Sequence, residues 1–136
     1  MRSLVYSLAF LFGFTACTKP EAVTPDALTG VWVEETARQD TLFFNLDQSG
    51  KSLPNSLWVK RGKEINQGGF LVPKIGSGIY QYSLLNNRIS VRNMLSSSSQ
   101  LTDYWIEQRD KKLLIDNFFE LGSNQPATAT RTLVRL

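Results

Sequence analysis

Apolar and polar residues alternate along most of the chain beyond its N-terminal region, with a period of two rather than 3.6. In residues 40–47, for example, Leu42, Phe44 and Leu46 fall on one face of an extended segment. Similar patterns predict strands over residues 29–36, 40–47, 56–61, 69–75, 79–84, 88–92, 103–108, 112–116 and 131–136. No segment carries a sustained amphipathic helical face, and the serine-rich residues 95–100 favour a loop over a short helical turn. The pattern therefore predicts an all-β domain.

Turn-forming residues separate the predicted strands at intervals of about 8–12 residues. These turns lie at residues 48–51, 66–69, 76–78, 86–87, 109–111 and 122–124. Asn86 and Asn87 tolerate the positive φ of a tight hairpin. Short strands at this spacing are typical of an antiparallel sandwich or barrel. We predict a single small antiparallel β-barrel of about eight strands.

The N-terminus has a different character. A basic residue, Arg2, precedes an apolar run over residues 4–14, and the small residues Thr15 and Ala16 then precede Cys17. This is the layout of a secretory signal peptide, and the run is shorter than the roughly 20 residues that span a bilayer. Residues 14–17 resemble the lipobox of bacterial lipoproteins. That resemblance implies that Cys17 becomes the lipidated first residue of the mature protein.

Two other interpretations of the N-terminus stay open: a cleaved signal peptide with an incidental cysteine, or a buried N-terminal segment of a cytosolic protein. Lipidation is favoured because the chain has no second cysteine for a disulfide, and an exposed free thiol is a liability in an oxidising compartment. The expected organisation is a signal peptide (1–16), a lipidated N-terminus and tether (17–27) and a folded domain (28–136). The non-acidic Thr18 resembles an outer-membrane address, on its periplasmic or its surface face.

The predicted first strand contains Gly30 and Trp32, and this Gly-x-Trp element resembles the opening of lipocalin barrels. In that family the tryptophan closes one end of the barrel, and an arginine of the last strand packs over it. The resemblance implies this role for Arg131 or, on the same strand, Arg135. More broadly, the chain is similar to small lipocalin-like lipoproteins of Bacteroidota in residues 28–32, 40–44 and 132–136. The resemblance implies the barrel fold and no particular ligand.

The charges of the chain are nearly balanced, with 15 basic and 12 acidic residues. Removal of residues 1–16 takes away only Arg2 and leaves 14 against 12. The basic clusters at 60–63 and 109–112 have the character of solvated turns rather than of the continuous basic face that binds nucleic acid. We therefore expect no nucleic-acid partner.

The residue types that most often carry chemistry are scarce. There is no histidine, which removes the usual general base and metal ligand, and Cys17 is committed to the anchor. Asp47, Asp110 and Asp116 flank turns but do not form the clustered loop of a calcium site. We predict a protein that is not an enzyme, with no catalytic residue, metal or cofactor.

Two sets of residues are candidates for binding. Aromatic side chains with polar ends would line a pocket for a small amphipathic or hydrophobic ligand, and core packing is the alternative for them; they are Tyr80, Tyr82, Tyr104 and Trp58. The long polar loop over 60–70 is the candidate partner-binding loop, with a solvated hairpin as the alternative; its candidate contacts are Arg61, Lys63 and Glu64.

Three functional hypotheses follow. The first is an envelope-anchored, lipocalin-like barrel that binds a small ligand in its interior. The second is a structural or interaction lipoprotein with a filled core, which binds an envelope protein through its loops. The third is a periplasmic inhibitor or chaperone. An eight-stranded barrel is either just filled by side chains or holds one small ligand, so the state of its interior separates the first two hypotheses.

Overall fold

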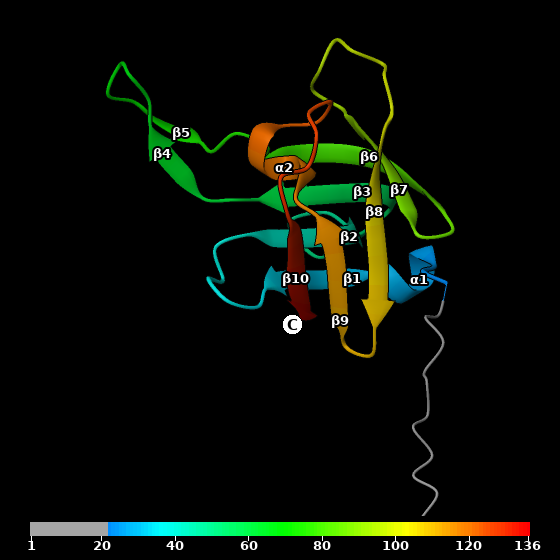
Figure 1. Cartoon of the computed structure of the whole chain (residues 1–136). Helices are drawn as coiled ribbons and strands as arrows, with labels where there is room; N and C mark the ends of the chain where they lie inside the picture. Colours follow the sequence, from blue (N-terminus) through cyan, green and yellow to red (C-terminus); the bar gives the residue numbers. More distant parts are fainter. Residues whose placement is uncertain (1–21) are drawn as a thin grey trace, which may run out of the picture.

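The computed structural model describes residues 22–136, which form a closed barrel of eight antiparallel strands with a projecting two-stranded hairpin (Figure 1). This architecture confirms the predicted all-β barrel. The predicted signal peptide (1–16) and the lipidation site, Cys17, lie outside the described residues. Within residues 22–136, no helix is long and apolar enough to cross a membrane.

The barrel strands are β1 (Gly30–Glu34), β2 (Thr41–Leu46), β3 (Ser52–Lys60), β6 (Gly78–Leu85), β7 (Arg88–Asn93), β8 (Thr102–Arg109), β9 (Lys112–Asp116) and β10 (Thr130–Arg135). The hairpin consists of β4 (Lys63–Ile65) and β5 (Leu71–Pro73). Two helices of four residues each complete the fold, α1 (Pro25–Leu28) and α2 (Phe118–Leu121). Each predicted strand overlaps an observed one, whereas β4 and both helices were not predicted.

Neighbouring strands follow one another up and down around the barrel, in the order β1-β10-β9-β8-β7-β6-β3-β2. The hairpin β4–β5 is inserted between β3 and β6, and α2 between β9 and β10. Asn86 and Asn87 form the predicted tight turn, since Leu85 pairs with Arg88 and Asn86 has a φ of +54°. Pairing between β10 and β1 closes the barrel and leaves no open edge in its wall.

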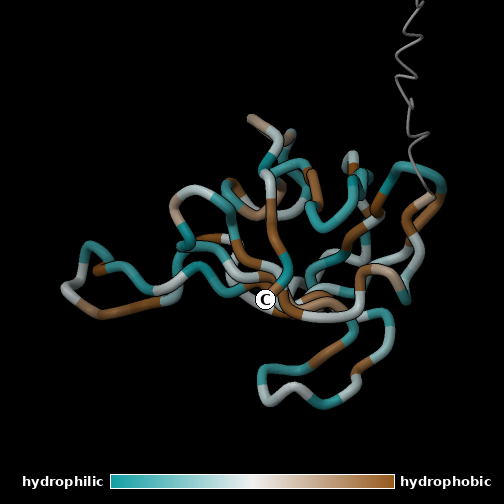
Figure 2. Tube along the Cα trace, turned by 90° about the horizontal axis from the view of Figure 1, so that it is seen from below, coloured by the Kyte–Doolittle hydropathy of each residue, from teal (hydrophilic) through white to brown (hydrophobic). Residues whose placement is uncertain are grey.

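The apolar side chains of alternate residues point into the barrel and fill it. Figure 2 shows this alternation as short hydrophobic and hydrophilic stretches along the strands. The core contains several side chains that are fully buried, including Trp32, Leu42, Phe44, Leu57, Tyr80, Ile89, Ile106, Ile115 and Leu133. An eight-stranded barrel is just wide enough for such side chains to meet at its centre. The period-two pattern of the sequence therefore produces a filled core.

Helix α1 covers one end of the barrel, here called the α1 end. Pro25 occupies the first turn, and the Thr24 hydroxyl caps it by accepting from the Ala27 amide at 3.2 Å. Leu28 is fully buried, and Val23 is 6% exposed. The folded part therefore begins at Val23 at the latest, earlier than the boundary at residue 28 that the proline-rich sequence predicts.

Helix α2 covers the other end, the α2 end, and inserts Phe118 and Phe119 into the core with at most 1% exposure. Asn117 holds the segment that leads into β10 against this helix. Its side-chain oxygen accepts from the Thr128 and Ala129 amides at 2.9 and 3.0 Å. Both ends of the barrel are thus covered by short helices whose apolar residues extend the core.

Candidate functional site

Trp32 lies across the α1 end of the barrel with Arg135 above it. The Arg135 guanidinium carbon is 4.6 Å from the centre of the indole ring, and the register of β1 and β10 places the two residues directly opposite each other. The Trp32 indole N–H donates to the Leu28 carbonyl at 2.7 Å. Gly30 has a φ of +139°, where L residues are rare, and a Cβ there would lie 3.9 Å from Arg135 Nε.

The arginine over Trp32 is Arg135, so the assignment of this role to Arg131 is corrected. Arg131 lies four residues earlier on the same face of β10, which places it about 13 Å away along the strand, near the α2 end. There its guanidinium bonds to Glu120 and lies 3.9 Å from Glu34. Arg131 therefore ties α2 to β10 and β1 instead of closing the barrel.

The three tyrosines predicted to bind a ligand belong to the core. Tyr80, Tyr82 and Tyr104 are each at most 3% exposed, and each hydroxyl donates to an acceptor within the protein. The acceptors are Gly76 O at 2.8 Å, Asn45 Oδ1 at 2.9 Å and Gln125 O at 2.8 Å, respectively. Burial raises the pKa of Tyr80 to about 12, which reflects a phenol enclosed by apolar groups.

The structure does not gather the four aromatic candidates into one site. Tyr80 and Tyr104 pack against Phe118 near the α2 end, with ring centres 5.4 and 5.0 Å from it. Tyr82 packs edge-on against Phe44 nearer the α1 end. Trp58 points to the outside of the barrel wall, since its β3 neighbours Leu57 and Val59 point inward. The three tyrosines therefore pack within the core, and Trp58 lies on the outer wall.

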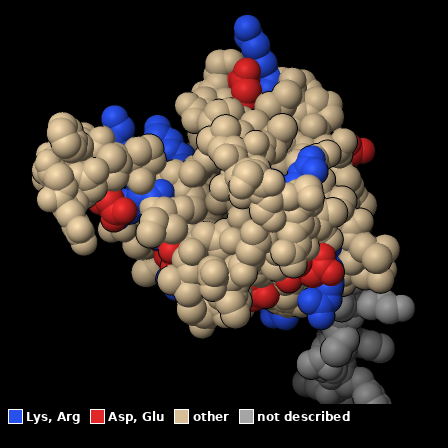
Figure 3. All heavy atoms as spheres, turned by 90° about the horizontal axis from the view of Figure 1, so that it is seen from above, with Lys and Arg blue, Asp and Glu red and all other residues tan. Residues whose placement is uncertain are grey.

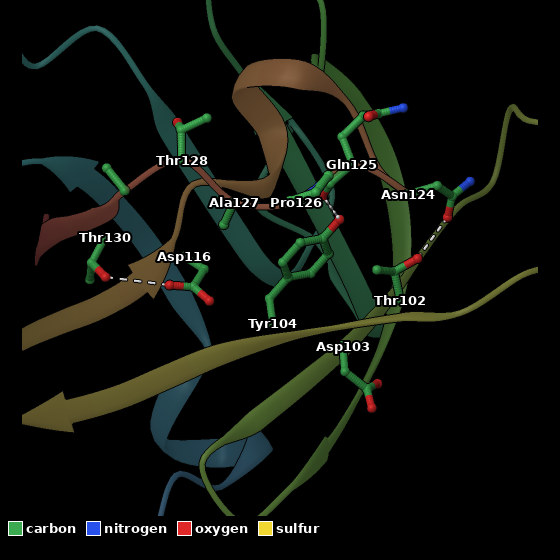
Figure 4. A pocket seen from close by; sticks show the side chains of 11 residues that line it. Thr102, Asp103, Tyr104, Asp116, Asn124, Gln125, Pro126, Ala127, Thr128 and Thr130 are labelled. Atoms are coloured by element: carbon green, nitrogen blue, oxygen red, sulfur yellow. Dashed lines mark hydrogen bonds between the residues drawn. The ribbon is translucent and has the colours of Figure 1, made fainter.

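A surface pocket of about 500 Å³ lies where β8 extends beyond the end of β9 (Figure 4). It is lined mainly by polar residues of β8 and of the segment before β10, including Thr102, Asp103, Asp116, Gln125 and Thr128. Two side-chain hydrogen bonds join residues of this lining: Thr102 donates to Asn124 at 2.7 Å, and Thr130 donates to Asp116 at 3.3 Å. Figure 4 shows Tyr104 among them, with its hydroxyl on the Gln125 carbonyl. The pocket is a shallow polar depression outside the core.

The hairpin β4–β5 extends away from the barrel at the α2 end (Figure 1). Its apolar side chains lie in solvent: Ile65 is 73%, Phe70 71% and Leu71 63% exposed. Lys63 and Glu64, two of the predicted partner contacts, are exposed on β4. Figure 3 shows basic side chains and an acidic one on the part of the hairpin nearer the barrel, and an outer part without charged groups. The hairpin therefore offers an uncharged, partly apolar outer part beyond a stem that carries Lys63 and Glu64.

Arg61, the third predicted partner contact, is instead a structural residue at the base of the hairpin. Its side chain is 15% exposed, and its Nε donates to Asp40 Oδ1 at 3.1 Å. Its Nη1 donates to the carbonyls of Ile75, Phe119 and Glu120 at 2.8, 3.0 and 3.3 Å. Arg61 thus joins the hairpin exit and α2 to the segment that precedes β2.

Gly76 lies at the same junction and has a φ of +81°. A Cβ at this position would be 1.6 Å from the Phe119 carbonyl oxygen, so only glycine allows α2 to approach the hairpin exit this closely. Close contact between these two backbones brings the carbonyls within reach of Arg61. The base of the hairpin is therefore fixed, while its outer part is free of the barrel.

Comparison of the chain with family models, with curated proteins and with solved structures finds no match. In the described residues, 22–136, no group of three or more His, Cys, Asp or Glu side chains is placed to hold a metal ion. Strand β4 was not predicted because its three residues are too few to show an alternating pattern. Its one signal in the sequence is the apolar Ile65 within a polar stretch.

Proposed function

We propose that this protein is an envelope-anchored lipoprotein whose filled barrel presents the hairpin β4–β5 to a partner protein, without catalysis. The observation that carries the proposal is the exposure of Ile65, Phe70 and Leu71 on an element that projects from a barrel with a filled interior. Single exposed apolar residues are ordinary on protein surfaces. Three of them on one short hairpin form a surface for contact with another molecule.

An interior ligand, the other predicted function, has less support. A binding pocket for a small molecule is a cleft or cavity of about 300–1,000 Å³ with apolar walls. Here Trp32 and α1 cover one end of the barrel, and Phe118 and Phe119 cover the other. The tyrosine hydroxyls that would orient a ligand are bonded within the protein.

The energetics of the hairpin favour a partner. A two-stranded sheet on its own is marginally stable in water, and β4–β5 has no third strand. Complete burial of one large apolar side chain contributes about 1.5–3 kcal/mol. Contact with a partner would bury several such side chains at once and would stabilise the hairpin further.

The direction of the hairpin relative to the expected anchor favours a protein over the anchoring bilayer. The described chain enters at the α1 end, whereas β3 ends and β6 begins at the α2 end, where the hairpin is inserted. With Cys17 lipidated, the five residues up to Ala22 span about 18 Å at most. Such a tether holds the α1 end close to the membrane, and the hairpin then faces away from it.

Site-specific photo-crosslinking in the native host tests this function. A photoreactive amino acid at position 70 is expected to give one discrete crosslinked species, because Phe70 is 71% exposed on the hairpin. The matched control is position 85, since Leu85 is 73% exposed near the α1 end. Ile65→Ser with Leu71→Ser should lower the crosslink at position 70 about tenfold or more. Equal products from positions 70 and 85, or none from position 70, would overturn the proposal.

The anchor has its own test. Cys17→Ser is expected to abolish incorporation of labelled fatty acid and to release the protein from the membrane fraction, because multiple acyl chains provide stable attachment. Thr15→Ser is the control, as it keeps a small residue before the cysteine. Continued membrane retention of Cys17→Ser, with labelling absent, would contradict lipid anchoring.

A further inference from the structure

The two edges of the hairpin differ in their unpaired backbone groups. The Asn66 amide donates to the Phe70 carbonyl at 2.9 Å, and the Lys74 amide donates to the Gly62 carbonyl at 3.1 Å. Hydrogen-bonded pairs alternate with non-bonded pairs along an antiparallel ladder. Between these two bonded pairs, Glu64 and Val72 therefore form a bonded pair, because they oppose each other in the register.

The remaining pairs, Lys63 with Pro73 and Ile65 with Leu71, direct their backbone groups outward. The outer edge of β4 thus presents the amides and carbonyls of Lys63 and Ile65. The outer edge of β5 presents the Leu71 amide, but Pro73 has no N–H and interrupts the row of donors. One edge of the hairpin is complete as a template for a further strand, and the other is blocked.

We infer that the outer edge of β4 binds an extended segment of the partner protein by β-strand addition, which makes the hairpin a three-stranded sheet. This inference rests on the proposed function. In this mode the main-chain bonds of Lys63 and Ile65 supply affinity, and alternate side chains supply specificity. Three strands with an apolar face are also the smallest sheet that is stable without other support.

Charge on β4 identifies the chemistry of the incoming segment. Antiparallel pairing of β4 with a second copy of itself places Glu64 opposite Glu64 in one register and Lys63 opposite Lys63 in another. A third register, with Ile65 opposite Ile65, would place Lys63 opposite Gln67 in the turn, so the pairing would not extend over β4. Like charges directly opposite each other are destabilising, so a second copy is disfavoured. An apolar strand with an acidic residue opposite Lys63 fits, and the basic side chains of Lys60 and Lys74 at the base of the hairpin add attraction.

A lipid surface fits the hairpin less well. Its tip, residues 66–69, consists of Asn66, Gln67 and two glycines, so the outermost residues are polar. Insertion into a bilayer would bury these polar groups before Ile65 and Leu71 reached the acyl chains. Ile65 and Leu71 lie opposite each other in the stem, where an added strand would pack against them, while the Phe70 ring lies beside Gly68 at the tip.

The experiment uses the full lipidated chain in detergent and a random twelve-residue peptide library displayed on phage. Enriched peptides are expected to alternate apolar and polar residues and to carry an acid. Ile65→Pro removes an outward amide of β4, and Leu71→Pro removes the equivalent amide of β5 with the same loss of the Ile65–Leu71 pair. Ile65→Pro should weaken peptide binding about tenfold or more, and Leu71→Pro should change it less than about threefold.

Amide hydrogen exchange of the unmutated chain gives a second measurement. Exchange at Lys63 and Ile65 should slow at least about tenfold when the peptide binds, while Leu71 remains fast. Equal effects of the two proline variants, an unprotected β4 edge, the absence of any enriched peptide, or binding only to anionic vesicles would overturn strand addition. If crosslinking from position 70 persists in those cases, the proposed function stands without this mode; loss of both overturns both.

Discussion

Trp32→Ala is expected to lower the free energy of unfolding by about 3–5 kcal/mol. Trp32 is fully buried, and its truncation would leave a cavity at the α1 end of the barrel. The Leu28 carbonyl would lose its indole donor, and the Arg135 guanidinium would lose the ring beneath it. Because Leu28 is the last residue of α1, the substitution should also loosen the helix that covers this end.

Urea unfolding monitored by circular dichroism measures this effect. Trp58→Ala is the matched control, since the same side chain is removed from the outer wall, and it should lower stability by less than half as much. Trp32→Phe retains most of the ring and should lower stability by only about 1–3 kcal/mol, chiefly through the unpaired Leu28 carbonyl. A loss below about 1 kcal/mol for Trp32→Ala would show that Trp32 does not close the barrel.

The barrel was predictable because its core positions follow a simple period. Leu42 and Phe44 on β2 and Tyr80 and Tyr82 on β6 are buried as their alternation predicts. Filling of the barrel was not predictable in this way, because the same alternation describes hollow and filled barrels. The α2 end is filled partly by Phe118 and Phe119, on a helix of four residues that is too short to display a helical period.

The roles of individual charged residues depended on contacts distant in the sequence. Arg131 and Arg135 lie on the same face of β10, and only the register with β1 places Arg135 over Trp32. Arg61 and Lys63 are two residues apart in one basic cluster, yet Arg61 meets Asp40 from a segment 21 residues earlier. The charge pattern alone does not distinguish these residues from one another. Tertiary packing decides which of them has a structural role and which is exposed.

Arg61→Met is expected to lower the free energy of unfolding by about 3–5 kcal/mol. Methionine keeps much of the apolar stem but removes every donor, so the Asp40 carboxylate, on a side chain that is 9% exposed, would remain buried without its cation. The carbonyls of Phe119 and Ile75 would lose their shared donor as well. Removal of one partner from a buried, hydrogen-bonded ion pair leaves the other charge buried and unpaired. This destabilises the protein by more than the intact pair stabilises it.

Urea unfolding again measures the loss, and Arg88→Met is the control, because Arg88 is exposed and should change stability by less than about 0.5 kcal/mol. Asp40→Asn combined with Arg61→Met should be less destabilising than the sum of the two changes, by about 1–3 kcal/mol. Additive effects would contradict the Arg61–Asp40 pairing. Since Arg61 also bonds to Ile75 at the exit of the hairpin, Arg61→Met should weaken crosslinking from position 70 although the Arg61 side chain is only 15% exposed. An unchanged crosslink in folded Arg61→Met would mean that the hairpin binds without a fixed base.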